Sequence, residues 1–102
     1  MEENLLLTYQ QQALIAINSE RFSQEIKWGK ESNMVTDRGL REYMKTKLVV
    51  LMEEVGELSK EVLDWDDLNN LVTEAIQVAA VAQAIVEGSL YGVRNIEQAK
   101  PV

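Results

Sequence analysis

Residues 71–86, Leu-Val-Thr-Glu-Ala-Ile-Gln-Val-Ala-Ala-Val-Ala-Gln-Ala-Ile-Val, decide the fold of this chain. Twelve of these sixteen residues are apolar, and a helix that is apolar on nearly all sides is expected to be buried. The segment nevertheless carries Glu74 and Gln77 on one side. A lone buried carboxylate is costly unless a cation pairs with it. We therefore expect either a Lys or Arg side chain or a metal ion beside Glu74.

The remaining sequence also predicts helices, because no stretch shows the alternation of apolar and polar residues that is typical of a strand. Thr36 or Asp37 is expected to cap the second helix and Asp66 or Asp67 the third. Gly88 is expected to end the third helix. The chain is predicted to be a single all-α domain over residues 1–102. The expected helices span residues 4–27, 38–64 and 67–87, and a tail over residues 89–102 has room for a short helix.

The length of these helices predicts self-association. Each has about 22 residues and is therefore roughly 33 Å long. Three such rods in a chain of 102 residues leave more apolar surface than one small chain can cover. We expect a helical bundle whose core is completed by dimerisation, as a homodimer or a dimer of dimers. In it, the second and third helices of two chains form a four-helix core.

The composition excludes several functions. The chain has no His and no Cys, which rules out Ser-His-Asp and Cys-His catalysis, disulfides and most zinc sites. Its net charge of −7 argues against a nucleic-acid polymer as partner, because such binding depends on neutralising phosphates. No apolar run approaches the roughly 18 residues of a membrane span. We therefore expect no membrane partner and a cytoplasmic location.

The acidic residues are concentrated in one segment. Residues 53–67 hold seven acids and one base, a net charge of −6, whereas residues 21–47 hold seven bases and four acids, a net charge of +3. The acidic segment begins with Glu53-Glu54-Val55-Gly56-Glu57, and Glu74-Ala75-Ile76-Gln77 follows on the next helix. Spacings of three and four residues place side chains on one helix face, where like charges repel one another. Carboxylate and amide oxygens suit Mg²⁺ or Mn²⁺. We predict a cation site here, and two solvated acid pairs are the alternative.

At these residues the chain resembles the MazG-like all-α nucleoside triphosphate pyrophosphohydrolases. The pattern of that family is Glu-Glu-x-x-Glu, a spacer, and then Glu-x-x-Asp. Glu53-Glu54-x-x-Glu57 and Glu74 fit the pattern, whereas Gln77 stands where Asp is usual. The segment Lys27-Trp28-Gly29 is also similar to one branch of the family. The resemblance covers about residues 20–88.

The resemblance implies a site and a reaction. Glu54, Glu57, Glu74 and Gln77 would hold Mg²⁺ (or Mn²⁺), and Glu53 would orient a ligand or the attacking water. The protein would be a hydrolase that converts a nucleoside triphosphate and water to the monophosphate and pyrophosphate. The implied substrate-binding residues are the aromatic side chains Trp28 and Trp65, as stacking partners of the base, and the basic side chains Lys27, Lys30 and Arg38, as partners of the phosphates.

Two alternatives remain open from the sequence. The first is a non-enzymatic or degenerate interaction module of the same fold, with Gln77 as the first sign of a lost metal site. The second is a phosphoribosyl-ATP pyrophosphohydrolase, which shares the fold and the use of metal. The residues Val-Ala-Ala-Val and Lys-Trp-Gly favour the MazG-like interpretation over this second alternative.

Overall fold

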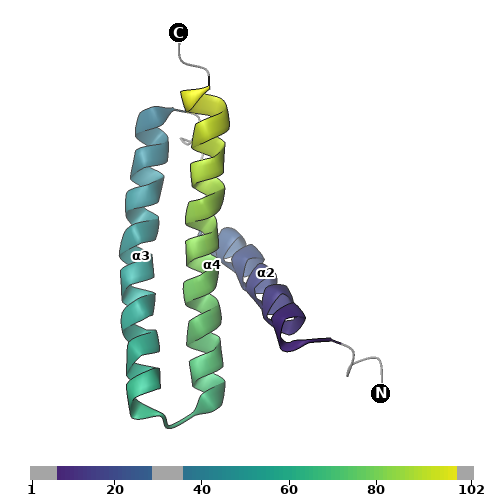
Figure 1. Cartoon of the computed structure of the whole chain (residues 1–102). Coiled ribbons are helices and arrows are strands. Elements are labelled where there is room, and N and C mark those ends of the chain that lie inside the picture. Colours follow the sequence, from purple (N-terminus) through teal and green to yellow (C-terminus); the bar gives the residue numbers. More distant parts are fainter. Residues whose placement is uncertain (1–6, 29–35, 99–102) are drawn as a thin grey trace.

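The computed structural model describes residues 7–28 and 36–98. In these residues the chain is 91% helical and has no strand, so the predicted all-α class is confirmed. Helix α3 (Asp37–Asp64) and helix α4 (Leu68–Gly92) form a long antiparallel hairpin. Helix α2 (Tyr9–Trp28) packs against α4 and diverges from it toward its own N-terminal end (Figure 1). A short π-helix, η2 (Val93–Glu97), continues from α4.

The helix ends of the α3–α4 hairpin are fixed by local hydrogen bonds. Asp67 caps α4, because its carboxylate accepts from the backbone N–H groups of Asn69 (2.9 Å) and Asn70 (3.4 Å). Trp65 ends α3 in the left-handed conformation, with φ of 50°, which is uncommon for a bulky residue. At the start of α3, the hydroxyl of Thr36 accepts from the N–H of Gly39 at 2.9 Å. Thr36 and Asp67 are both among the predicted caps.

The prediction that Gly88 ends the third helix was wrong, because α4 continues to Gly92. Gly88 is buried against α3, and a Cβ there would lie 3.1 Å from Met44 Sδ and 3.3 Å from Tyr43 Cε2. A Cβ at Gly92 would lie 2.6 Å from Leu40 Cδ2. Both glycines therefore allow the close approach of α3 and α4, and Gly92, the last residue of α4, has a right-handed φ of −62°.

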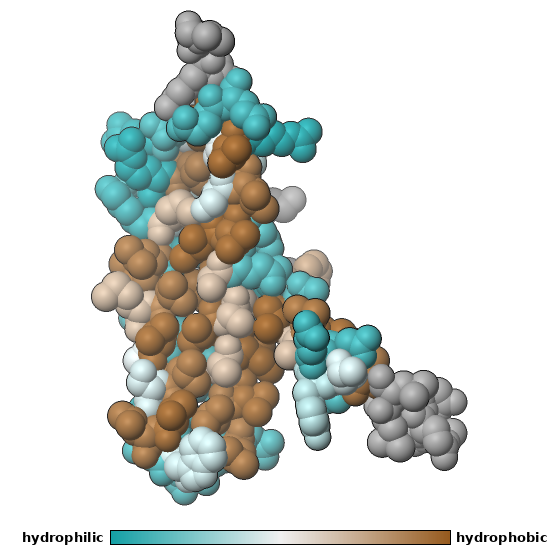
Figure 2. Space-filling model, in the orientation of Figure 1, coloured by the Kyte–Doolittle hydropathy of each residue, from teal (hydrophilic) through white to brown (hydrophobic). Residues whose placement is uncertain are grey.

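The core of the single chain is thin. Among the described residues, the buried apolar side chains are Tyr43, Ala80, Val81 and Ala84. The expected burial of residues 71–86 is therefore only partly met within one chain: Val72 and Val86 are 53% and 56% exposed. Figure 2 shows apolar residues over much of the visible face of the hairpin. By length and composition alone, the segment Leu68–Glu97 could also cross a membrane, which is weak evidence for a span.

Polar side chains attach the C-terminal half of α2 to α4. Arg21 is buried, and its Nη2 donates to Glu87 Oε1 at 2.9 Å and lies 2.8 Å from Glu25 Oε1. Gln83 Nε2 donates to Asn18 Oδ1 at 3.2 Å and to Glu87 Oε2 at 3.0 Å. The partly buried pair of Arg21 and Glu87 holds α2 against α4, while the N-terminal half of α2 diverges from α4 (Figure 1).

The role of Gly88 can be tested against Gly56, a glycine inside α3 where an added Cβ would meet no atom within 4 Å. Gly56→Ala should raise the free energy of unfolding by about 0.5–1 kcal/mol, because Ala is the better helix former. Gly88→Ala should lower it by about 1–3 kcal/mol, the usual cost of overpacking. Urea unfolding of the two variants measures both. A stabilising Gly88→Ala would contradict the close-approach explanation.

Candidate metal site

The hairpin brings the two acidic motifs face to face. Glu54 and Glu57 lie one turn apart on α3, and Glu74 lies on α4 seven residues after the cap Asp67. Glu57 lies eight residues before Trp65, which ends α3. Because the two antiparallel helices leave the turn with nearly equal lengths, Glu57 and Glu74 meet across the hairpin.

Three carboxylates form one group at this position. One oxygen from each of Glu54, Glu57 and Glu74 lies within 4.8 Å of the others. Glu54 and Glu74 are partly buried, and Glu57 is exposed. In an octahedral Mg²⁺ site with bonds of 2.0–2.1 Å, neighbouring ligands are about 3.0 Å apart and opposite ones about 4.2 Å. Side-chain movements of about 1 Å would therefore let the group hold a hard cation, and the donor set fits Mg²⁺ or Mn²⁺.

The amide of Gln77 lies between two of these carboxylates. Carboxylate oxygens only accept hydrogen bonds when ionised, so the amide nitrogen must face them. In that orientation Gln77 Nε2 donates to Glu54 Oε2 at 2.7 Å and to Glu74 Oε2 at 3.1 Å. Gln77 thus bridges α3 and α4 as a donor. It would have to turn its amide to present an oxygen to a cation.

The environment of Glu74 opposes its ionisation. Its pKa is raised above the ordinary value of 4.5, first by burial and then by the negative charges of Glu57 and Glu54. A hydrogen bond with Glu57 and the charge of Glu61 act in the same direction. A site that favours a bound proton at one carboxylate also favours a bound cation in place of the proton.

None of the other sequence-predicted residues that the structure describes belongs to this group. Glu53 is exposed on α3, next to Glu54 but outside the group of three. Arg38 lies sixteen residues before Glu54, about 24 Å along α3. Trp65 is 67% exposed at the turn, eight residues or about 12 Å beyond Glu57. The side chains of Lys27 and Trp28, and the whole of Lys30, lie outside the described residues.

Two residues near the site are not among the predicted site residues. Glu61 adds its charge to the field at Glu74, and its position four residues after Glu57 on the same face was the signal that could have found it. Lys47 is buried, with its Nζ 5.1 Å from the centre of the Tyr43 ring. It lies two turns before Glu54 on the same face of α3, and a Lys within the apolar stripe of a helix was its signal.

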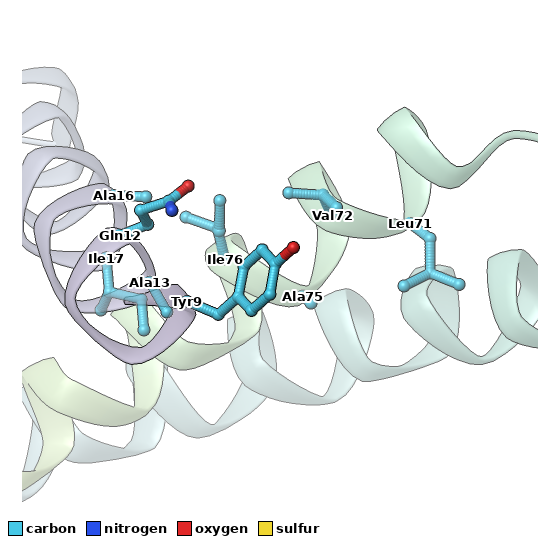
Figure 3. Close-up of a pocket in the computed structure, with 9 residues that line it drawn as sticks. All are labelled: Tyr9, Gln12, Ala13, Ala16, Ile17, Leu71, Val72, Ala75 and Ile76. Carbon is cyan, nitrogen blue, oxygen red and sulfur yellow. The ribbon is translucent and has the colours of Figure 1, made fainter. Parts of the chain in front are cut away.

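An apolar pocket of about 500 Å³ between α2 and α4 is separate from this site. Side chains of α2 and α4 face each other across it in Figure 3. Val72 and Ile76 each lie two residues from Glu74, so they point to nearly the opposite side of α4. The lining residues are Tyr9, Gln12, Ala13, Ala16, Ile17, Leu71, Val72, Ala75 and Ile76.

Comparison with known proteins adds no relative: no family model, no curated protein and no solved structure matches this chain.

The raised pKa of Glu74 predicts a pH dependence of stability in the metal-free protein. The folded state holds the proton of Glu74 more tightly than the unfolded state, so the contribution of Glu74 to stability is largest below pH 4.5 and is lost as the pH rises through the raised pKa. Glu74→Gln should therefore stabilise the chain at pH 7, with a gain that shrinks toward low pH. Melts of parent and variant in EDTA at several pH values measure the difference.

The matched control for this prediction is Glu42→Gln. Glu42 is an exposed carboxylate of α3 that pairs with Lys45 at 3.2 Å, far from the group. The control should not reproduce the pH-dependent gain. Parallel stability profiles for the parent and Glu74→Gln would show that the charges of Glu54 and Glu57 do not act on Glu74.

The position of Gln77 predicts a distinct response to Mg²⁺. Gln77→Asp removes the bridging donor and adds a charge, so the melting temperature of the metal-free variant should fall. Mg²⁺ should then raise it more than it raises the parent, because ligand charge is a main determinant of hard-cation affinity. Gln77→Ala is the control, since it removes the donor without adding charge. A fall in the melting temperature of Gln77→Asp that Mg²⁺ does not reverse would count against a cation site.

Proposed function

We propose that this protein is a Mg²⁺-dependent nucleoside triphosphate pyrophosphohydrolase, which hydrolyses the triphosphate to the monophosphate and pyrophosphate. The observation that carries the proposal is the convergence of three carboxylate oxygens within 4.8 Å. Such crowding raises the pKa of Glu74 and is unfavourable for folding in the absence of a cation or proton. Its presence between two well-capped helices is explained by cation binding.

Each residue of the site has a role in this reaction. Glu54, Glu57 and Glu74 would hold the ion, and Gln77 would supply a neutral oxygen after turning its amide. Mg²⁺ held there would neutralise charge on the polyphosphate and activate water. Glu53 orients the water that attacks the α-phosphorus. The water oxygen forms the new bond to that phosphorus, and the bond to the bridging oxygen breaks so that pyrophosphate leaves.

The proposal includes a second copy of the chain. In it, α3 and α4 of two chains form a four-helix core, as a homodimer or a dimer of dimers. The large apolar side chains that one chain leaves exposed on α3 and α4 support this assembly. A cytoplasmic location remains a prediction from the sequence.

A non-enzymatic module of the same fold is the second candidate, and the geometry of Gln77 favours it. Two hydrogen bonds from Nε2 to Glu54 and Glu74 reduce the need for a cation. The two candidates differ in a simple measurement. An enzyme releases pyrophosphate in a reaction that EDTA abolishes, whereas a module releases none from any member of a nucleotide panel that includes phosphoribosyl-ATP.

The proposed site predicts a loss of activity in two variants. Glu57→Gln and Glu74→Gln should each lower pyrophosphate release by more than about 100-fold, since even supporting groups of metal sites cost 10–100-fold. The fold should persist, because each change relieves repulsion among the carboxylates. Glu42→Gln should retain the parent rate. Activity of either site variant within a few-fold of the parent would refute the site.

A further inference from the structure

The exposed apolar side chains of α3 form a continuous stripe. At alternating spacings of four and three residues, one face of α3 presents Arg41, Lys45, Leu48, Met52, Val55, Ser59 and Val62. Leu48, Met52, Val55 and Val62 are all exposed large apolar residues. The alternation is the spacing by which two helices pack along each other. On α4, exposed Val86 and Leu90 extend the apolar surface, which covers much of the hairpin in Figure 2.

The chain exposes more surface than a compact monomer of its mass. The accessible surface is 7820 Å², whereas a compact monomer of 11.6 kDa has about 5800 Å². The radius of gyration is 16.6 Å, against about 13 Å for a compact chain of this length. The excess of about 2000 Å² includes the residues outside the described ranges, and the exposed large apolar side chains of α3 and α4 supply the part that a second copy can cover. A second copy of this chain is therefore the occupant that fits the surface.

The two ends of the hairpin carry opposite charges. At the open end, residues 36–47 hold four bases and two acids and residues 86–97 hold one base and two acids, a combined net charge of +1. At the turn end, residues 60–67 hold one base and four acids, a net charge of −3. The stripe on α3 thus begins with Arg41 and Lys45, continues through apolar residues and is followed, four residues after Val62, by Asp66. Like charges that face each other across an interface repel, which disfavours the orientation of the two chains that brings them together.

We propose that two copies dock through this surface with their hairpins antiparallel, so that Arg41 and Lys45 of one chain face the acidic turn around Asp66 of the other. A parallel pair would set the acidic turns against each other. The antiparallel pair is isologous, with each charged contact made twice. The two-fold axis then passes near Met52, about midway along the stripe. This inference rests on the proposed assembly and gives the orientation of its second copy.

Disulfide cross-linking tests the orientation, because the chain has no Cys of its own. The variants are Arg41→Cys, Asp66→Cys, the double variant that carries both, and Met52→Cys. Residues 41 and 66 lie at opposite ends of the hairpin, about 37 Å apart along α3, so no disulfide can form within one chain. After oxidation, non-reducing gels are expected to show covalent dimers for Met52→Cys and for the double variant only. Asp66→Cys alone should remain uncross-linked.

Other outcomes would overturn the proposal. A covalent dimer of Asp66→Cys alone would indicate the parallel pair. Light scattering that gives a mass of 11.6 kDa at micromolar concentration would exclude a second copy. Flotation of the chain with phosphatidylcholine or phosphatidylglycerol vesicles would assign the apolar surface of α4 to a membrane.

The test is independent of the proposed activity. Pyrophosphate release by the reduced double variant is measured in parallel, since neither changed residue belongs to the group of three carboxylates. The expected cross-linking pattern in a chain without activity would uphold the orientation and refute the enzymatic function. Pyrophosphate release by a chain with the cross-linking pattern of a parallel pair would uphold the enzymatic function and refute the orientation.

Discussion

The register of the α3–α4 hairpin is the constraint on which the rest of the structure depends. At the closed end it is set by the cap Asp67 and the left-handed Trp65. Toward the open end it is set by Gly88, where α3 side chains fill the space that a Cβ would occupy. One residue of slip rotates a helix by about 100°, which would carry Glu74 away from Glu54. Two short structural features at the ends of the hairpin therefore position a site in its middle.

The carboxylates of that site repel one another. Burial and two neighbouring carboxylates raise the pKa of Glu74, so the fold holds the charges together at some cost in stability. Gln77 relieves part of the cost, because one amide nitrogen donates to Glu54 and to Glu74. An Asp at this position would add a fourth negative charge and no donor. The amide thus stabilises the group of carboxylates without adding a negative charge.

Much of the fold could be predicted from the sequence because its signals are local. The caps Thr36 and Asp67 are recognisable from their side chains, which accept backbone hydrogen bonds at a helix start. The prediction at Gly88 failed because a glycine after an apolar run fits both a helix end and a close helix contact, and only the position of Tyr43 and Met44 distinguishes them. The acidic motifs are visible as spacing, but their closeness depends on the length of the turn.

The less predictable part of the site concerns contacts between distant residues. Lys47 is a charged residue that the fold buries, with its Nζ 5.1 Å from the centre of the Tyr43 ring. Arg38 is basic and precedes the motif, which suggests a phosphate ligand, yet a straight helix separates it from Glu54 by about 24 Å. On a long straight helix, residues that are near one another in the sequence can lie far apart in space. Residues on opposite arms of the hairpin, in contrast, come into contact.

The two sides of α4 differ in polarity. Glu74 and Gln77 point to the side of α4 that faces Glu54, while Val72 and Val86 remain exposed. Because side chains two residues apart on a helix point in nearly opposite directions, α4 can be apolar along most of its length and still present a polar edge. A chain with a core this thin needs the apolar side for stability. The carboxylates can therefore lie close together on the polar edge without being part of the apolar packing.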